Sequence, residues 1–332
     1  MDNQLKLWKR LYELTNQITI CQPWNDLWSG EFICVQVDNK EPLYCTIMGR
    51  NKECIGVSVY EGEKGYGDLL SISELIYDEE VTKYMMFEQT CITFYMGNVD
   101  EVPPHQKEIM KKLGLRYRGK GKWPYFMSFE ARYVPIGIEK EEDIKKMIIV
   151  FEALIDMMDK MSFHDVHFDD DEMLYISYDS SCQQWVHEPM VLPEPYDKFS
   201  PIELDDRSII EELKKKAFNH KELYLDLVYI HSKINDPSMK RPLNALIFIV
   251  VDKQSQMIIH VDVLNEEDDE IQTILEFFVS YILQKGKMYK VLVRNPNVYA
   301  SILDICQQCH IQIENDGFMI VDNIIGEMAR MM

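Results

Sequence analysis

Residues 115–137 read LRYRGKGKWPYFMSFEARYVPIG and form the one strongly basic, aromatic-rich segment of an otherwise acidic chain. We call them the basic segment. Aromatic residues at positions 123, 125, 126, 129 and 133 are interleaved with five bases and the single acid Glu130. The bases are Arg116, Arg118, Lys120, Lys122 and Arg132. The segment can fill a core or line a pocket, and it separates a predicted small sheet upstream from an acidic connector and a second domain downstream.

Length and charge set the broad class. With 332 residues the chain is long for one domain and suits two, each able to form its own core. The net charge is −21, and residues 139–200 hold 5 basic against 16 acidic residues. A negative field repels phosphate backbones, so we expect no general nucleic-acid binding. The acidic surface serves solubility or docks a basic protein partner.

The sequence predicts a cytoplasmic protein without membrane contact. The stretch MDNQLKLWKRLYELTNQ lacks the apolar core and cleavage site of a secretory signal. The longest apolar run, Ala245–Val251, is far shorter than the roughly 20 residues of a membrane helix. The eight cysteines are therefore expected to be reduced thiols. We expect no cofactor, and the sequence leaves the oligomeric state open.

The first half has the pattern of an antiparallel sheet with helices. Apolar spacing predicts a first helix that ends before Pro23. The β-rich runs FICVQV, LYCTIM and CIGVSVY predict an antiparallel meander, closed by a glycine-rich turn at 61–67. Helices are predicted over 71–84, 104–113 and 139–161, and strands over 91–96, 162–168 and 172–178. Pro124 limits the run that follows it to an edge or irregular path.

The second half predicts a mixed sheet covered by helices. The stretch after Trp185 is irregular and proline-rich, and residues 191–206 are interpreted as a linker between domains at 1–190 and 207–332. A helix is predicted over 209–218, and residues 223–231 fit a strand or a helix equally. A hairpin over 243–264 opens a ββαβαβα order. The predicted fold class is α+β, an antiparallel-sheet α+β domain followed by a mixed-sheet α/β domain.

Several motifs carry a family resemblance. They are WKRLYEL (8–14), QPW (22–24), YCTIMGR (44–50), VSVYEGEKGYGDL (57–69), LGLRYRGKGKWPYF (113–126) and RPLNALIFIVVDKQSQMIIHVDVL (241–264). With them the chain resembles an uncharacterised bacterial two-domain family over most of its length. The domains of that family carry no assigned function, so the resemblance implies a two-domain layout and no mechanism.

Two patterns, one with cysteines and a histidine and one with histidines and acids, are candidates for cofactor or metal chemistry. Residues 306–310, CQQCH, match the c-type haem string, but both thiols fall on one face near the end of a predicted helix, which favours core cysteines. In residues 164–172, HDVHFDDDE, the two histidines would point to opposite faces of a strand. Asp169 and Asp171 stay weak metal candidates in what we interpret as an acidic hairpin tip.

The order of elements in the second domain invites comparison with ribonuclease-H-like domains, which hold two metal ions between converging carboxylates. Asp252 is the one plausible carboxylate, and it lies at the end of the hairpin. The strand at 291–293 ends in Arg294 and Asn295, where an acid would be needed, and Glu276 falls in mid-helix. A metal-dependent nuclease, in degenerate form, is therefore an alternative and not the leading hypothesis.

The leading hypothesis is a non-enzymatic interaction or regulatory protein with no predicted catalytic residues. A further alternative is a small anionic ligand bound at the basic segment by Arg116, Arg118, Lys120, Trp123 and Arg132. Its aromatic residues favour a core position. The cations can also pair with acidic residues 139–200 of the same chain, and this intramolecular docking is the interpretation we favour from the sequence.

Overall fold

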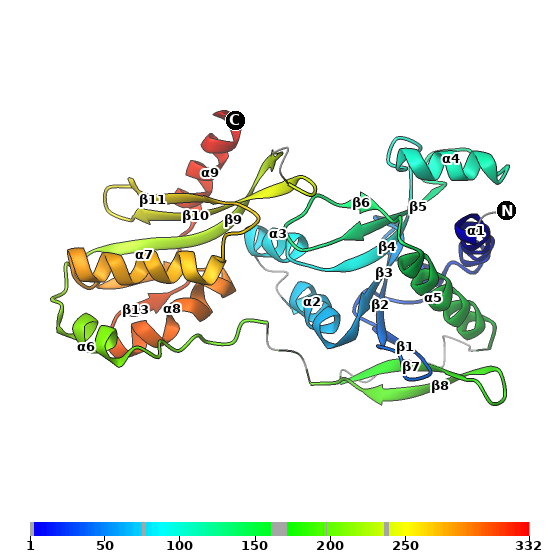
Figure 1. The fold of residues 1–332 in the computed structure, drawn as a ribbon, viewed down its shortest axis with the longest axis horizontal. Helices are drawn as coiled ribbons and strands as arrows, with labels where there is room; N and C mark the ends of the chain where they lie inside the picture. The colour runs from blue at the N-terminus through cyan, green and yellow to red at the C-terminus, as the bar shows by residue number, and fades with distance from the viewer. Residues whose placement is uncertain are drawn as a thin grey trace. The chain divides into compact units, whose positions relative to one another are not determined.

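The computed structural model describes residues 3–74, 78–160, 171–194, 196, 198–235 and 239–331 (Figure 1). They form two compact units. The first unit contains Met1–Glu74, Gln89–Ala131 and Pro135–Tyr196. The second contains Asp197–Met332 and two short segments from earlier in the chain, Leu75–Glu88 and Arg132–Val134. The basic segment therefore contributes residues to both units. No helix in the described ranges is long and apolar enough to span a membrane.

The first unit is built on an eight-stranded sheet with the order β6-β5-β4-β3-β2-β1-β7-β8. Neighbouring strands are antiparallel except for the parallel pair β1 and β7, and the antiparallel sheet predicted for this half is confirmed. The strands are β1 (Ile33–Val37), β2 (Leu43–Met48), β3 (Gly56–Glu61), β4 (Cys91–Gly97), β5 (Trp123–Phe129), β6 (Ile136–Gly137), β7 (Glu172–Asp179) and β8 (Gln184–Val191).

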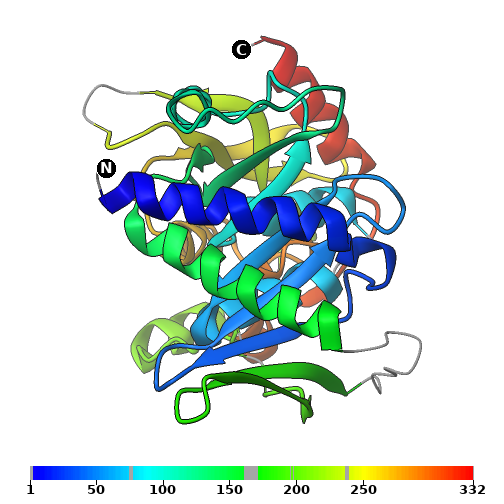
Figure 2. The ribbon, with the colours of Figure 1, turned by 90° about the vertical axis from the view of Figure 1, so that its right-hand side faces the viewer.

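Helices cover both faces of this sheet. Helices α1 (Asn3–Cys21) and α5 (Glu141–Lys160) lie side by side across one face, as Figure 2 shows, and Ile33 and Val35 join their core. Cys34 faces the other side, toward α2 (Gly62–Glu74), as strand alternation requires. The 3₁₀ turn η1 (Pro23–Asn25) follows α1, and α4 (Pro104–Lys112) precedes the basic segment.

Three local predictions for the first half are wrong. Residues 61–67 do not form a turn: Glu61 ends β3 and Gly62, at φ +68°, begins α2 and permits the abrupt change from strand to helix. The helix predicted over 71–84 is divided between α2 and α3 (Glu79–Phe87), which the Asp78 side chain caps. The start of the stretch after Trp185 is not irregular but belongs to β8, which runs to Val191 and whose edge position tolerates Pro189. The strand predicted over 162–168 lies outside the described residues.

The second unit has a five-stranded mixed sheet, order β11-β10-β9-β12-β13, which confirms the prediction. The ambiguous run at 223–231 is part of β9, antiparallel to β10 and parallel to β12. The strands are β9 (Glu222–Ile234), β10 (Leu243–Asp252), β11 (Ile258–Leu264), β12 (Lys290–Val293) and β13 (Gln312–Glu314). The helices from this half are α6 (Arg207–Lys215), α7 (Glu270–Lys285), α8 (Pro296–Cys309) and α9 (Met319–Met331).

The two faces of this second sheet are covered by different helices. Ile247 and Ile249 of β10 pack with Val321 of α9 in one apolar cluster. Phe248, between them, points to the opposite face and meets Phe277 of α7 with ring centroids 5.7 Å apart. Each residue of β10 is buried, so this strand lies in the centre of the core.

Candidate functional site

The basic segment leaves α4 through Gly114, whose φ of +71° ends the helix. The residues that follow alternate in direction. Leu115 and Tyr117 pack on the core of the first unit, whereas Arg116 and Arg118 are exposed. Tyr117 is held between the rings of Tyr12 and Trp123, at centroid distances of 6.3 and 6.1 Å. The packed aromatic side chains therefore fix the backbone that presents the two arginines.

A pocket of about 570 Å³ lies beside these arginines, within the first unit. Its walls come from α1, η1, the turn between β2 and β3, and residues 116–124. The polar lining residues are Thr15, Asn16, Thr19, Gln22, Asn25, Lys52, Arg116, Arg118 and Lys122. Trp24, Ile55, Met96, Tyr117 and Pro124 supply an apolar part. Its size and mixed lining are typical of small-molecule sites.

The charge of this pocket is one-sided. Its lining contains Lys52, Arg116, Arg118 and Lys122 and no carboxylate. Within the described part of the chain, none of these four side chains makes a hydrogen bond or an ion pair. Four cations around one hollow repel one another, and an anion bound there would relieve that repulsion.

The structure separates the residues that the sequence grouped as an anion site. Arg116 and Arg118 line the pocket, and Trp123 supports it from behind Tyr117. Lys120 is exposed on the same loop but does not line the pocket. Arg132 belongs to the second unit, where its guanidinium donates to the carbonyl oxygens of Asn265 and Asp268.

Sequence reasoning missed the rest of the lining. Lys52 lies in a turn about 65 positions before the arginines, and Asn16 and Asn25 belong to α1 and η1. Asn16 accepts a hydrogen bond from the Tyr117 hydroxyl at 3.4 Å, which ties α1 to the basic segment. No spacing pattern links these positions, and only the packing of α1 beside residues 115–124 brings them together.

The docking of the basic segment on acidic residues 139–200 is not seen among the described residues. Charged residues of α5 instead pair with other parts of the first unit. Glu152 pairs with Arg10 of α1 at 2.7 Å, and Lys146 pairs with Glu61 at 2.6 Å. Neither Arg116 nor Arg118 contacts a carboxylate in the described ranges.

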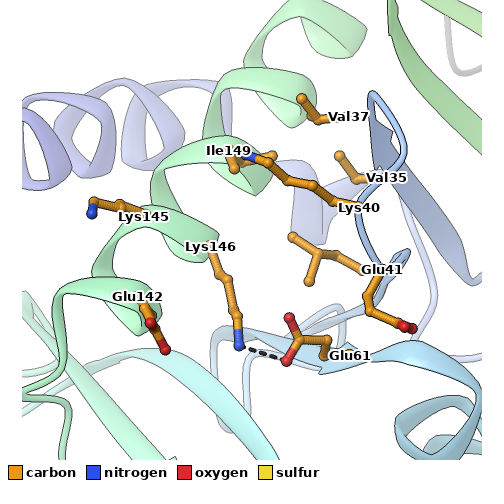
Figure 3. A pocket seen from close by; sticks show the side chains of 10 residues that line it. Val35, Val37, Lys40, Glu41, Glu61, Glu142, Lys145, Lys146 and Ile149 are labelled. Carbon is orange, nitrogen blue, oxygen red and sulfur yellow. Dashed lines mark hydrogen bonds and ion pairs between the residues drawn. The ribbon is translucent and has the colours of Figure 1, made fainter.

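A second pocket in the first unit, of about 200 Å³, lies between α5 and strands β1 and β2. Figure 3 shows its three lysines and three glutamates around an apolar floor that includes Val35 and Val37. Lys146 points to Glu61, so part of this charge is already paired. The balanced charge gives no preference for an anion or a cation, which makes this pocket the weaker candidate.

The second unit holds a buried ion cluster around Arg294. Its guanidinium contacts Asp226 of β9 at 2.8 Å and Asp322 of α9 at 2.6 Å, and lies over the Phe318 ring. The Arg294 and Asp226 side chains are only 3% and 1% exposed. Burial raises the pKa of Asp226 to about 6, against the opposing effect of Arg294. The guanidinium also pairs with a third carboxylate, that of Asp78, at 3.8 Å.

This cluster corrects the carboxylate chosen for the nuclease comparison. Strand β9 precedes the hairpin, and its mid-strand acid is Asp226, not Asp252. Asp252 instead caps the hairpin turn through Gln254 and Ser255 and pairs with Lys221. A metal ion between Asp226 and Asp322 would have to displace the Arg294 guanidinium.

The remaining metal and cofactor candidates have structural positions or fall outside the described residues. Cys306 and Cys309 are buried in α8, and burial raises the pKa of both thiols. Asp171 is exposed in a turn, and Asp169 is not among the described residues. Among the described side chains, no three from His, Cys, Asp and Glu are grouped as a metal site.

A pair of carboxyl groups in the second unit was not predicted. Glu88, just after α3, accepts a hydrogen bond from the Tyr229 hydroxyl, and Glu270 accepts from Tyr84 at 2.8 Å and Asn297 at 2.7 Å. Burial, with the Glu270 carboxylate adding to it, raises the pKa of Glu88 to about 7. Its proton equilibrium is thereby shifted to near neutral pH.

This shift predicts a pH-dependent stability. Below Glu88's ordinary pKa of 4.5 the carboxyl is protonated in both the folded and unfolded states. Between pH 4.5 and about 7 the unfolded chain ionises first, so the free energy of unfolding should fall as pH rises through this window. When the free energy of unfolding is measured by chemical denaturation, that of Glu88→Gln should not show this fall between pH 4.5 and about 7. Glu211→Gln, at an exposed helix position, should keep it, and identical profiles for wild type and Glu88→Gln would contradict the assignment.

Comparisons with known proteins give a family and no activity. A model described as Domain of unknown function (DUF7309) matches residues 8–176, half of the chain. A second, Domain of unknown function (DUF6930), matches residues 209–329. No curated protein and no solved structure matches the chain. The predicted two-domain family resemblance is confirmed by these two matches.

Proposed function

We propose that this chain, which belongs to the family described as Domain of unknown function (DUF7309), is a binding protein rather than an enzyme, and that its first unit binds a small anionic ligand. The observation that carries the proposal is the pocket beside Arg116 and Arg118, whose lining has no acid and four cations without a side-chain partner among the described residues. In a protein of net charge −21, such a concentration of positive charge requires a reason.

The lining suggests the chemistry of the ligand. Arginine guanidinium groups bind planar carboxylates and phosphates through paired hydrogen bonds, and lysines add charge without fixed direction. Asn16 and Asn25 offer amide groups for neutral polar atoms, and Trp24 and Tyr117 offer apolar surface. A ligand with one phosphate or two carboxylates attached to a compact organic part fits this combination.

The second unit supports binding over catalysis. Arg294 already pairs with the carboxylates of Asp226 and Asp322. A phosphodiester-cleaving metal site needs open coordination positions, and the guanidinium occupies the space between these acids. The second unit would then act as a scaffold or docking module for the ligand-binding unit.

The test is ligand-induced stabilisation of the full chain. Thermal shift and calorimetry with pyrophosphate, AMP, ATP and citrate should give a dissociation constant for at least one probe. Replacing both Arg116 and Arg118 with glutamine should weaken binding by about tenfold or more for each charge-assisted pair lost.

The matched control is Lys111→Gln with Lys112→Gln. These residues lie on α4, are exposed and do not line the pocket, yet their replacement makes the same change in net charge. The control should bind like wild type. Absence of binding to every probe, or equal weakening in both double variants, would overturn the proposal.

A further inference from the structure

Strand β11 is an exposed apolar edge. It is the outermost strand of the second unit's sheet and pairs on one side only, with β10. Ile259, Val261 and Val263 are 44%, 40% and 50% exposed. In the described part of the chain, no strand occupies the other side of β11. Its outer backbone groups are therefore available for pairing with another strand.

The described sheets protect their other edges. Strand β6 has two residues, β13 has three, and β8 carries Pro189. Short strands and proline are the usual devices that prevent edge-to-edge pairing. Strand β11 has seven residues, IIHVDVL, with neither lysine nor proline. This difference indicates that β11 is kept open for a partner.

The two faces of β11 differ in chemistry. Val261 and Val263 pair with Ile249 and Ile247 of β10 and share the face that α9 covers further along the sheet. His260 and Asp262 point to the α7 face, where the two side chains contact each other at 2.7 Å and the His260 ring lies 4.7 Å from the Phe277 ring. Val261 and Val263 thus make one face apolar, and the other face carries the His260–Asp262 contact.

We infer that β11 pairs with β11 of a second copy of this chain, antiparallel, around a two-fold axis through Val261. A two-fold axis perpendicular to the sheet keeps each face on its own side, so only residues that share a face can stand opposite each other. The axis must therefore pass through a residue and not between two residues. Near the centre of β11 this leaves three registers, with the axis at His260, Val261 or Asp262.

Only the central register pairs His260 with Asp262. An axis at His260 places His260 opposite its copy, and an axis at Asp262 places two carboxylates opposite each other, which is unfavourable. An axis at Val261 places each His260 opposite an Asp262, a pair that stabilises an antiparallel ladder. The irregular pairing near Val250 and Val251 lies at one end and leaves residues 260–264 regular. The two sheets would join into one of ten strands.

The test is the oligomeric state of the full chain, measured by light scattering and analytical ultracentrifugation over a range of concentrations. Wild type should form a dimer. Val261→Lys places two lysines opposite each other and should raise the dimer dissociation constant at least tenfold. Val191→Lys, which adds the same charge at the exposed end of β8, should leave it unchanged.

A charge swap tests the register and is independent of any folding defect in Val261→Lys. His260→Asp places aspartates opposite each other and should weaken the dimer, and adding Asp262→His should restore it. A monomeric wild type, a dimer insensitive to Val261→Lys, or a double variant as weak as the single one would overturn the proposal.

Discussion

Replacing Arg294 with alanine is expected to lower the free energy of unfolding of the second unit by about 3–5 kcal/mol. The Arg294 side chain is 3% exposed and bridges Asp226 and Asp322, which come from β9 and α9. Its loss leaves the Asp226 carboxylate buried without a cation. The desolvation cost of that carboxylate is then uncompensated, and urea denaturation should show the loss directly.

The Arg294→Ala defect should also depend on pH. Without the guanidinium the pKa of Asp226, which burial already raises to about 6, rises further in the folded state. Acid then protonates Asp226 in the folded protein and removes the unpaired charge. The difference from wild type should therefore be larger at pH 8 than at pH 5.

Two further variants separate the ion cluster from general damage. Lys253→Ala breaks a pair with Glu222 that is 41% and 35% exposed, and it should cost less than about 1 kcal/mol. Combining Arg294→Met with Asp226→Leu removes both charges and should recover much of the loss, because well-packed apolar side chains can replace a buried pair. A double variant no more stable than Arg294→Ala would contradict this account.

Sequence patterns could predict the elements of the second unit but not this cluster. The run around Asp226 is apolar on both sides, so a strand and a buried helix fit it equally. Asp226, Arg294 and Asp322 are separated by 68 and 28 positions. They meet because β9 and β12 are parallel neighbours, and topology of that kind is not encoded in local spacing.

The candidate pocket could be predicted only in part, because some of its lining residues are also far apart in the sequence. Alternation of apolar and basic residues at 115–118 correctly separates Leu115 and Tyr117, which pack inward, from Arg116 and Arg118, which do not. Proximity in sequence wrongly added Arg132. The chain passes into the second unit at that residue, where φ is +69°. Lys52 could not be predicted as a lining residue, because it lies in the distant turn between β2 and β3 and only the fold brings it to the pocket.

Replacing Gln106 with leucine is expected to destabilise the first unit by about 1–3 kcal/mol. Gln106 of α4 is fully buried, and its amide acts as a missing strand partner for β5: it donates to the Phe126 carbonyl at 2.7 Å and accepts from the Phe126 N–H at 3.1 Å. Ile138, directly after β6, also donates to the Phe126 carbonyl at 3.1 Å, but the Phe126 N–H has the Gln106 oxygen as its partner. Leucine would leave the buried N–H without a partner.

Gln36→Leu is the matched control for Gln106. Its amide also donates to backbone carbonyls, those of Asp38 and Lys40, but at an exposed turn where water can replace it. Gln36→Leu should lower the free energy of unfolding by less than about 1 kcal/mol, and equal losses in the two variants would refute the assigned role of Gln106.

Because α4 and β5 flank the loop that carries Arg116 and Arg118, Gln106→Leu should also weaken anion binding, whereas Gln36→Leu should not. The buried amide would thus connect the stability of the sheet edge to the geometry of the pocket.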